Sequence, residues 1–238
     1  MRFPLLAVLA ALTITGPVAA QNLSEADVKA LVLETILENP SIIMQAIDLL
    51  RTQEEDDKDA AQQQAFEDNK ELLQRDPNAP VLGNPDGDVT IVEFFDYNCG
   101  YCKRSMPVLQ SILAKDKNIR LVYREFPILS EGSVFASRAA LASRAQGKYE
   151  EFHWAMMSAE RADEASVMRI AEQIGLDLAK LRIDMDAPEV VEHINTSREI
   201  ASAMQFNGTP SFTIGDAIVG GFIPEDAMLE LIAQARDG

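Results

Sequence analysis

The sequence is poor in the residues that most often build metal centres, with two cysteines and two histidines among 238 residues. Basic residues are also scarce, since 21 lysines and arginines face 38 acidic residues and leave a net charge of −17. This excess of acid argues against nucleic acid or anionic lipid as a partner. No segment beyond residue 20 is apolar enough to predict a membrane span. The apolar fraction of 47% is ordinary for a globular protein.

Residues 1–20 form the one strongly apolar stretch, MRFPLLAVLAALTITGPVAA. It has a single basic residue, Arg2, an apolar core too short to span a bilayer comfortably, and small residues up to Ala20. These features predict a secretory signal peptide that is cleaved after Ala20. The alternative, a retained anchor, is disfavoured because Gly16 and Pro17 break the apolar run. Export would bring the cysteines into an oxidising compartment.

Both cysteines follow directly on an apolar run. Val89 to Phe95 has the β-branched and aromatic composition of a buried strand, and beyond Gly100 the apolar spacing becomes helical. We therefore expect Cys99 at the N-terminal tip of a helix, where unpaired backbone N–H groups stabilise a thiolate. Nearby Lys103 adds positive charge. The sequence predicts a lowered pKa for Cys99 and a more enclosed, resolving Cys102.

Three other interpretations of the cysteine pair are considered. A C-x-x-C zinc half-site lacks a second half, because no further cysteine exists and His153 and His193 lie far away in the sequence. A structural disulfide across so short a loop would contribute only about 2 kcal/mol. Two inert core cysteines are the third alternative, although a strand-to-helix junction is where reactive cysteines are found.

The stretch FFDYNCGYCKRSMP resembles the thioredoxin superfamily, in particular the DsbA-like branch that includes ScsC-type periplasmic thiol-disulfide proteins. A second family signature, a cis-proline loop facing the cysteines, is matched by Gly208-Thr209-Pro210-Ser211-Phe212. The resemblance implies that Pro210 is cis and that the backbone of Thr209 pairs with an extended substrate strand beside Cys99. Taken alone, Thr-Pro indicates only a turn or a strand start, since most X-Pro bonds in folded proteins are trans.

Glu93 lies six residues before Cys99, where many family members have a buried acid. Burying a charged carboxylate inside the run Ile91 to Phe95 would be costly, so its pKa should rise and it could exchange a proton with Cys102. The alternative is that Glu93 points to solvent on a one-sided strand. Both interpretations remain open from the sequence.

Residues 21–75 are predicted to form a helical segment with a linker, ahead of a main domain at 76–238. Apolar residues follow two helical stripes on either side of Asn39 and Pro40, and then a polar helix-forming run extends from Thr52 to Gln64. The stretch ILENPSIIMQAI resembles the N-terminal domain of ScsC-type proteins. This resemblance implies that the segment associates with copies of itself, with a trimer favoured. The alternative is that the stripes dock on the main domain of the same chain.

The main domain is expected to have an α/β thioredoxin-like fold with a helical insertion at about 128–206, before the cis-proline strand. The elements predicted after the first cysteine helix are a strand at 119–126, helices at 133–146 and 163–174, a helix beginning at Pro188, strands at 211–214 and 217–219, and a helix at 224–236. We assign no catalytic role to His153 or His193, which lie on separate predicted helices.

The dipeptide between the cysteines helps set the direction of exchange. DsbA-like oxidases use Pro-His there, whereas Gly100-Tyr101 resembles the CGYC motif of the isomerase DsbC. The resemblance therefore implies a periplasmic disulfide isomerase or reductase without a cofactor. It would act on misfolded or oxidised exported proteins and be kept reduced by a DsbD-like membrane partner. Two alternatives remain, a dithiol oxidase and a copper-tolerance protein that binds Cu(I) through Cys99 and Cys102.

Overall fold

The structure is a computed structural model that describes residues 24–237, so the predicted signal peptide lies outside the described residues. The chain divides into two compact units between Glu55 and Asp56. In chain order its elements are α1 (Glu25–Glu38), α2 (Ser41–Arg75), β1 (Val81–Gly83), β2 (Val89–Phe95), α3 (Gly100–Lys115), β3 (Ile119–Glu125), α4 (Glu131–Ser143), the 3-10 helix η1 (Arg144–Gln146), α5 (Tyr149–Ser158), α6 (Glu164–Gln173), α7 (Leu178–Asp184), α8 (Pro188–Ala203), β4 (Ser211–Ile214), β5 (Ala217–Gly220) and α9 (Glu225–Asp237).

The first unit consists of α1 and the N-terminal part of α2. Helix α1 begins with a capping box, in which Ser24 and Asp27 each accept a hydrogen bond from the other's backbone N–H. It ends at Asn39, and Pro40 precedes the next helix. No residue of α1 is buried. The apolar stripes of this unit therefore remain in contact with solvent in the single chain.

Within the described residues, no helix by itself has the length and apolar composition of a membrane span. Helices α1 and α2 satisfy that test only as a pair, and the chain bends by 91° between them.

The second unit is built on a five-stranded sheet with the order β1-β3-β2-β4-β5. The central strands β2 and β3 are parallel, while β1, β4 and β5 join as antiparallel strands. Both central strands are buried along their whole length, as expected for strands covered on both faces. Strand β1 was not predicted, because three residues after Pro80 are too few to form a recognisable pattern.

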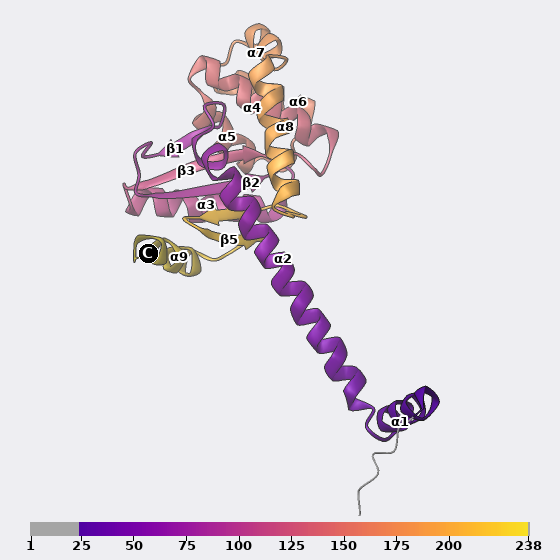
Figure 1. Cartoon of the computed structure of the whole chain (residues 1–238). Helices are drawn as coiled ribbons and strands as arrows, with labels where there is room; N and C mark the ends of the chain where they lie inside the picture. The colour runs from indigo at the N-terminus through magenta and orange to yellow at the C-terminus, as the bar shows by residue number, and fades with distance from the viewer. Residues whose placement is uncertain (1–23, 238) are drawn as a thin grey trace, which may run out of the picture. The chain divides into compact units, whose positions relative to one another are not determined.

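Alternate residues of β2 face two separate cores. Ile91 and Phe95 face the larger core, which contains residues of α3, α4, α5 and α9. Val92 and Phe94 face the smaller core, where α2 and α8 cover the sheet. Figure 1 shows α4 to α8 grouped on one side of this unit. The predicted helical insertion is therefore present, and it lies between β3 and β4 in the chain.

The C-terminal half of α2 belongs to the sheet-containing unit. Phe66 and Leu73 are fully buried in the smaller core. Arg120 and Arg124 of β3 donate hydrogen bonds to the carbonyls of Gln74 and Leu72, which satisfies free acceptors at the end of the helix. The compact unit thus begins at Asp56, ahead of the boundary that the sequence places at residue 76.

The segment that follows α2 is held by a buried ion pair rather than running free as a linker. Oδ2 of Asp76 lies 2.6 Å from Nη1 of Arg124, and both side chains are at most 5% exposed. Burial alone would raise the pKa of Asp76, but the facing His193 ring, the N–H of Asn78 and the Arg124 guanidinium lower that pKa to about 2. His193 is itself fully buried and accepts a hydrogen bond from the backbone N–H of Glu125 at 3.2 Å.

We predict that Phe66→Ala destabilises the sheet-containing unit by about 3–5 kcal/mol, the usual cost of truncating a buried aromatic residue. Denaturant unfolding measures this free energy. The matched control is Gln63→Ala on the exposed side of the same helix, which should change it by less than about 0.5 kcal/mol. Equal effects of the two substitutions would contradict the docking of α2 on the sheet.

Candidate active site

The two cysteines lie at the junction between β2 and α3. Cys99 is the N-cap residue of α3, and its Sγ accepts a hydrogen bond from the backbone N–H of Cys102 at 3.4 Å. Cys102 lies one turn further along the helix and is fully buried, whereas Cys99 is 7% exposed. Both are free thiols. The structure therefore confirms the predicted placement of both residues.

The environments of the two thiols shift their pKa values in opposite directions. A hydrogen bond from the Cys102 side chain, together with N–H groups at the start of α3, lowers the pKa of Cys99 to about 5 despite its burial. Burial raises the pKa of Cys102, and the hydrogen bond to Cys99 and the nearby Glu93 carboxyl raise it further. At neutral pH the pair therefore consists of one thiolate and one protonated thiol.

The predicted cis-proline loop faces Cys99. The Thr209–Pro210 peptide bond is cis, and the Sγ of Cys99 lies 3.1 Å from the carbonyl oxygen of Thr209, to which Cys99 donates when it is protonated. Pro210 is buried, while Thr209 is partly exposed. The fold thus brings together two motifs that are 110 residues apart in the chain.

Glu93 is 1% exposed and lies on β2, paired in register with Tyr123 of β3 and Phe212 of β4. Within the described part of the chain neither of its carboxylate oxygens has a hydrogen-bond partner. Burial raises the pKa of Glu93 well above its usual value, with smaller contributions from the charges of Cys99 and Glu125. Of the two interpretations that the sequence leaves open, the structure agrees with the buried acid.

A cluster of buried polar side chains that the sequence did not predict surrounds Glu125 at the end of β3. Oε1 of Glu125 accepts hydrogen bonds from the hydroxyl groups of Tyr97 at 3.3 Å and Tyr149 at 3.1 Å. The Tyr97 hydroxyl also lies 3.0 Å from Nδ1 of His153. Burial raises the pKa of Glu125 to about 8 and lowers that of His153 to about 3. The cluster therefore fixes Tyr97, two residues before Cys99, without a charge on the histidine.

The turn that leads into the cysteines is held by the helical insertion. Oδ2 of Asp96 accepts hydrogen bonds from the N–H groups of Ile128 and Leu129 at 2.9 and 3.0 Å. Asn98 donates to the carbonyl of Ala162 at 2.9 Å and accepts from its N–H, also at 2.9 Å. Asp and Asn after a strand signal a turn in the sequence, but these partners in the insertion are visible only in the fold.

The residues between and after the cysteines are more exposed. A Cβ placed on Gly100 would meet no atom within 4 Å, and Tyr101 is 55% exposed. The Arg104 guanidinium lies over the Tyr101 ring, 5.1 Å from its centroid. Lys103, whose positive charge the sequence places near Cys99, interacts with the charge of Cys99 and also donates to the carbonyl of Ala159 at 2.6 Å. The surface directly beside the cysteines is therefore open to a protein substrate.

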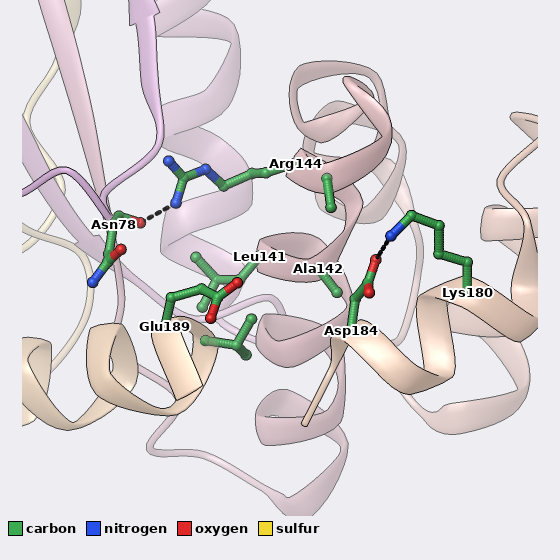
Figure 2. A pocket seen from close by; sticks show the side chains of 9 residues that line it. Asn78, Leu141, Ala142, Arg144, Lys180, Asp184 and Glu189 are labelled. Atoms are coloured by element: carbon green, nitrogen blue, oxygen red, sulfur yellow. Dashed lines mark hydrogen bonds and ion pairs between the residues drawn. The ribbon is translucent and has the colours of Figure 1, made fainter. Parts of the chain in front are cut away.

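A cavity of about 510 Å³ lies between α4, α7 and α8 and contains neither cysteine. Figure 2 shows that three of its four charged side chains are engaged: Arg144 donates to the carbonyl of Asn78, and Lys180 pairs with Asp184 at 2.6 Å, while no contact is drawn to Glu189. In the part of the chain that the structure describes, no group of three or more His, Cys, Asp or Glu residues could hold a metal ion. The cysteine pair thus remains the best-supported reactive centre.

Comparison with known proteins agrees with this geometry. The DSBA-like thioredoxin domain family matches residues 90–233. A thioredoxin-like oxidoreductase from Silicibacter pomeroyi DSS-3 is 56% identical, with a TM-score of 0.70 over 71% of this chain and 99% of that structure. ScsC from Proteus mirabilis in a compact conformation is 28% identical, with a TM-score of 0.67 over 90% of this chain and 98% of that one.

Among curated proteins, the Na(+)/H(+) antiporter NhaA 3 of Salinispora tropica is 28% identical over 137 residues, which are 56% of this chain and 21% of that protein. The chain spans about a fifth to a quarter of the length of the curated relatives it matches first.

We predict that the ultraviolet absorbance of the thiolate in the reduced protein titrates with a midpoint near pH 5, the pKa of Cys99. The transition should vanish in Cys99→Ser. In Cys102→Ala the midpoint should move to higher pH, because the variant removes the strongest hydrogen bond to the thiolate. An unchanged midpoint in Cys102→Ala would contradict this account of the low pKa.

Proposed function

Since the chain belongs to the DsbA-like thioredoxin-domain family and is a thiol-disulfide oxidoreductase, we propose that it isomerises the disulfides of exported proteins as a homo-oligomer. The observation that carries the proposal is the asymmetry of the pair, a thiol that is 7% exposed and has a pKa of about 5 beside a fully buried thiol with a raised pKa. Such a pair can hold a client in a mixed disulfide before the second thiol reacts.

The first step is attack by the Cys99 thiolate on one sulfur of a client disulfide. A bond forms between Cys99 Sγ and that sulfur, the client S–S bond breaks, and the other client sulfur leaves as a thiolate. Because the pKa of Cys99 is about 5, nearly all molecules are ready to attack at neutral pH. The low pKa also makes Cys99 a good leaving group later.

The second step decides the outcome of the reaction. If a client thiolate attacks the client sulfur of the mixed disulfide, a rearranged client is released and the Cys99 thiolate returns. If Cys102 attacks Cys99 Sγ instead, the client leaves reduced and Cys99 and Cys102 form a disulfide. The raised pKa of Cys102 slows this release of the reduced client, because the buried thiol must first lose its proton.

Glu93 is proposed to accept that proton. It is a buried carboxyl whose charge raises the pKa of Cys102, and neither of its oxygens has a hydrogen-bond partner among the described residues. Gly100 and Tyr101 are proposed to influence the direction of thiol-disulfide exchange at the cysteine pair, because they lack the imidazole found in Pro-His oxidases. Thr209 and Pro210 are proposed to present backbone groups to an extended client strand beside Cys99.

Assembly is proposed to occur through residues 21–75, with a trimer favoured. Leu33 and Leu37 are 59% and 69% exposed in the single chain, and no residue of α1 is buried. Apolar faces of this kind are normally covered by a partner. The proposed location is the periplasm, entered through the signal peptide at residues 1–20. The proposed clients are misfolded or oxidised exported proteins, and a DsbD-like membrane partner would keep the pair reduced.

A dithiol oxidase is the second candidate. The Cys99 pKa of about 5 lies between the values of about 7 for thioredoxin and about 3.5 for the oxidase DsbA. A stabilised thiolate makes the disulfide form more oxidising. Cu(I) binding by the pair has less support, since coordination by two thiolates would require the buried Cys102 to ionise as well.

We predict that Glu93→Gln slows the attack of Cys102 by about a hundredfold, the low end for loss of a general base. Stopped-flow mixing of the reduced protein with a chromophoric aryl disulfide separates two phases, attack by Cys99 and then resolution by Cys102. The first phase should be unchanged. In the parent protein the second phase should accelerate as pH rises through the raised pKa of Glu93, and this acceleration should disappear in the variant.

Glu125→Gln is the matched control for that experiment, because it removes another buried carboxyl of the same core. Its resolving phase should stay close to the parental rate and should still accelerate with pH, with the acceleration moved to lower pH because the charge of Glu125 contributes to the raised pKa of Glu93. If both substitutions slowed the resolving phase equally, the loss of any buried carboxyl would be enough to slow it. That result would contradict the proposed role of Glu93 as the proton acceptor.

We predict that the mature chain restores activity to scrambled ribonuclease at least about tenfold faster than a chain beginning at Asp56, because clustered active sites raise the effective concentration of thiols around a bound client. The full-length variant carrying Leu33→Glu and Leu37→Glu should behave like the shortened chain and sediment as a monomer. If neither chain isomerises but both oxidise reduced ribonuclease at the same rate, the protein is a dithiol oxidase.

A further inference from the structure

The loop between α8 and β4 contains the only Asn-Gly dipeptide in the sequence, Asn207-Gly208. Asparagine is chemically labile, most of all before glycine, because glycine has no side chain to keep its backbone nitrogen away from the asparagine amide. Neither residue belongs to a helix or a strand, and Asn207 is exposed while Gly208 is partly exposed. The dipeptide is therefore open to water and is not fixed by secondary structure.

The peptide group that joins Asn207 to Gly208 is not held by hydrogen bonds. In the part of the chain that the structure describes, neither the Asn207 carbonyl nor the Gly208 N–H has a hydrogen-bond partner, and the Asn207 side chain has none either. The hydrogen bonds of the loop lie on either side of it. The Phe206 N–H donates to the carbonyl of Ala201 at 2.8 Å, and the Gly208 carbonyl accepts from the Ser211 hydroxyl at 2.9 Å. This peptide group can therefore rotate without breaking a hydrogen bond.

The dipeptide also has open space in front of it. Asn207 and Gly208 both line a cavity of about 390 Å³, and a Cβ added to Gly208 would meet no atom within 4 Å. A ring that joins the Asn207 side chain to the Gly208 nitrogen thus has room to form, and water can reach it.

A second dipeptide that could form the same ring, Asp86-Gly87, is protected by the fold. The N–H of Gly87 donates to the carbonyl of Asn84 at 3.0 Å, and the N–H of Asp86 donates to the Asn84 side chain at 3.0 Å. A Cβ on Gly87 would collide with the carbonyl oxygen of Asn118, so the backbone is tightly packed there. Of the two dipeptides, the structure leaves Asn207-Gly208 free to react.

The reactive dipeptide directly precedes the residues that face Cys99. The carbonyl oxygen of Thr209, two residues after Asn207, lies 3.1 Å from Cys99 Sγ. The chain then passes through the buried Pro210 into β4, which anchors the far side of the loop. The position of the Thr209 carbonyl therefore depends on the path of the main chain through 207 and 208.

We propose that Asn207 is a site of spontaneous covalent modification that slows the thiol reaction as the protein ages. The Gly208 nitrogen attacks the side-chain carbon Cγ of Asn207 and loses its proton, a succinimide ring forms, and ammonia leaves. Water then opens the ring. Cleavage of the new N–Cγ bond gives aspartate, whereas cleavage of the bond from nitrogen to the original backbone carbonyl carbon gives isoaspartate. No oxidant or reductant takes part.

Isoaspartate is the product that disturbs the reactive centre. Its main chain runs through Cγ and is one carbon atom longer, which displaces Thr209 relative to Cys99. A displacement of about 1 Å at a reacting group can slow a reaction by about a hundredfold. The inference concerns attack by Cys99 itself, so it holds equally for an isomerase and for an oxidase.

The test incubates the full chain for days in warm, mildly alkaline buffer, with a parallel sample kept cold and mildly acidic. Digestion and mass spectrometry, after incubation in water that contains heavy oxygen, locate the new carboxyl group, and an isoaspartyl methyltransferase measures isoaspartate. The modified chains are separated by ion exchange, and their cysteines are reduced. They should attack a chromophoric aryl disulfide at least about tenfold more slowly than the unmodified chains of the same sample.

Gly208→Ala is the diagnostic variant, because its Cβ fits the structure but restricts the approach of the backbone nitrogen. It should slow the modification of Asn207 by at least about tenfold. Gly220→Ala is the matched control, since a Cβ there also meets no atom within 4 Å, and it should leave that rate unchanged. Absence of isoaspartate at position 207 in the aged parent, equal modification in both variants, or undiminished attack by the modified chains would each overturn the inference.

Discussion

The chemistry of this protein depends on the set of hydrogen bonds that converge on Cys99 Sγ at the start of α3. They are available because the helix begins at Gly100, so the N–H of Cys102 points at the sulfur and has no helical carbonyl to bind. The same geometry places Cys102 inside the core, where burial raises its pKa. One turn of helix thus separates a thiolate from a protonated thiol, and this difference gives the two cysteines distinct roles.

The rest of the sheet-containing unit holds that turn in position. Asp96 and Asn98 connect the residues before Cys99 to the helical insertion through backbone groups of Ile128, Leu129 and Ala162. The buried carboxyl of Glu125 fixes Tyr97 from the other strand. The insertion therefore helps to hold the turn at the active site, because its backbone supplies the hydrogen-bond partners of Asp96 and Asn98.

The features that the sequence predicted are local ones. The strand before the cysteines and the helix that begins after Cys99 each follow from a few neighbouring residues, whereas the sequence left the burial of Glu93 open and the fold decided it. The cis-proline loop was placed by family resemblance, since Thr-Pro itself carries little information. The docking of Phe66 and the ion pair of Asp76 with Arg124 were not predicted, because each depends on a partner far along the chain. The residues around Phe66 are mostly polar, so the apolar periodicity of the helix is weak. The sequence therefore does not indicate which side of the helix is buried.

The direction of exchange follows from a competition for one mixed disulfide. A client thiol reaches that bond from solvent, where it ionises freely, whereas Cys102 must first transfer a proton inside the core. In the proposed mechanism Glu93 controls the balance between the two outcomes, because burial raises its pKa well above the usual value and it can accept a proton only when it is ionised. In this proposal a rise in pH that ionises Glu93 favours resolution by Cys102. The buried acid would then set how long a client is held in the mixed disulfide.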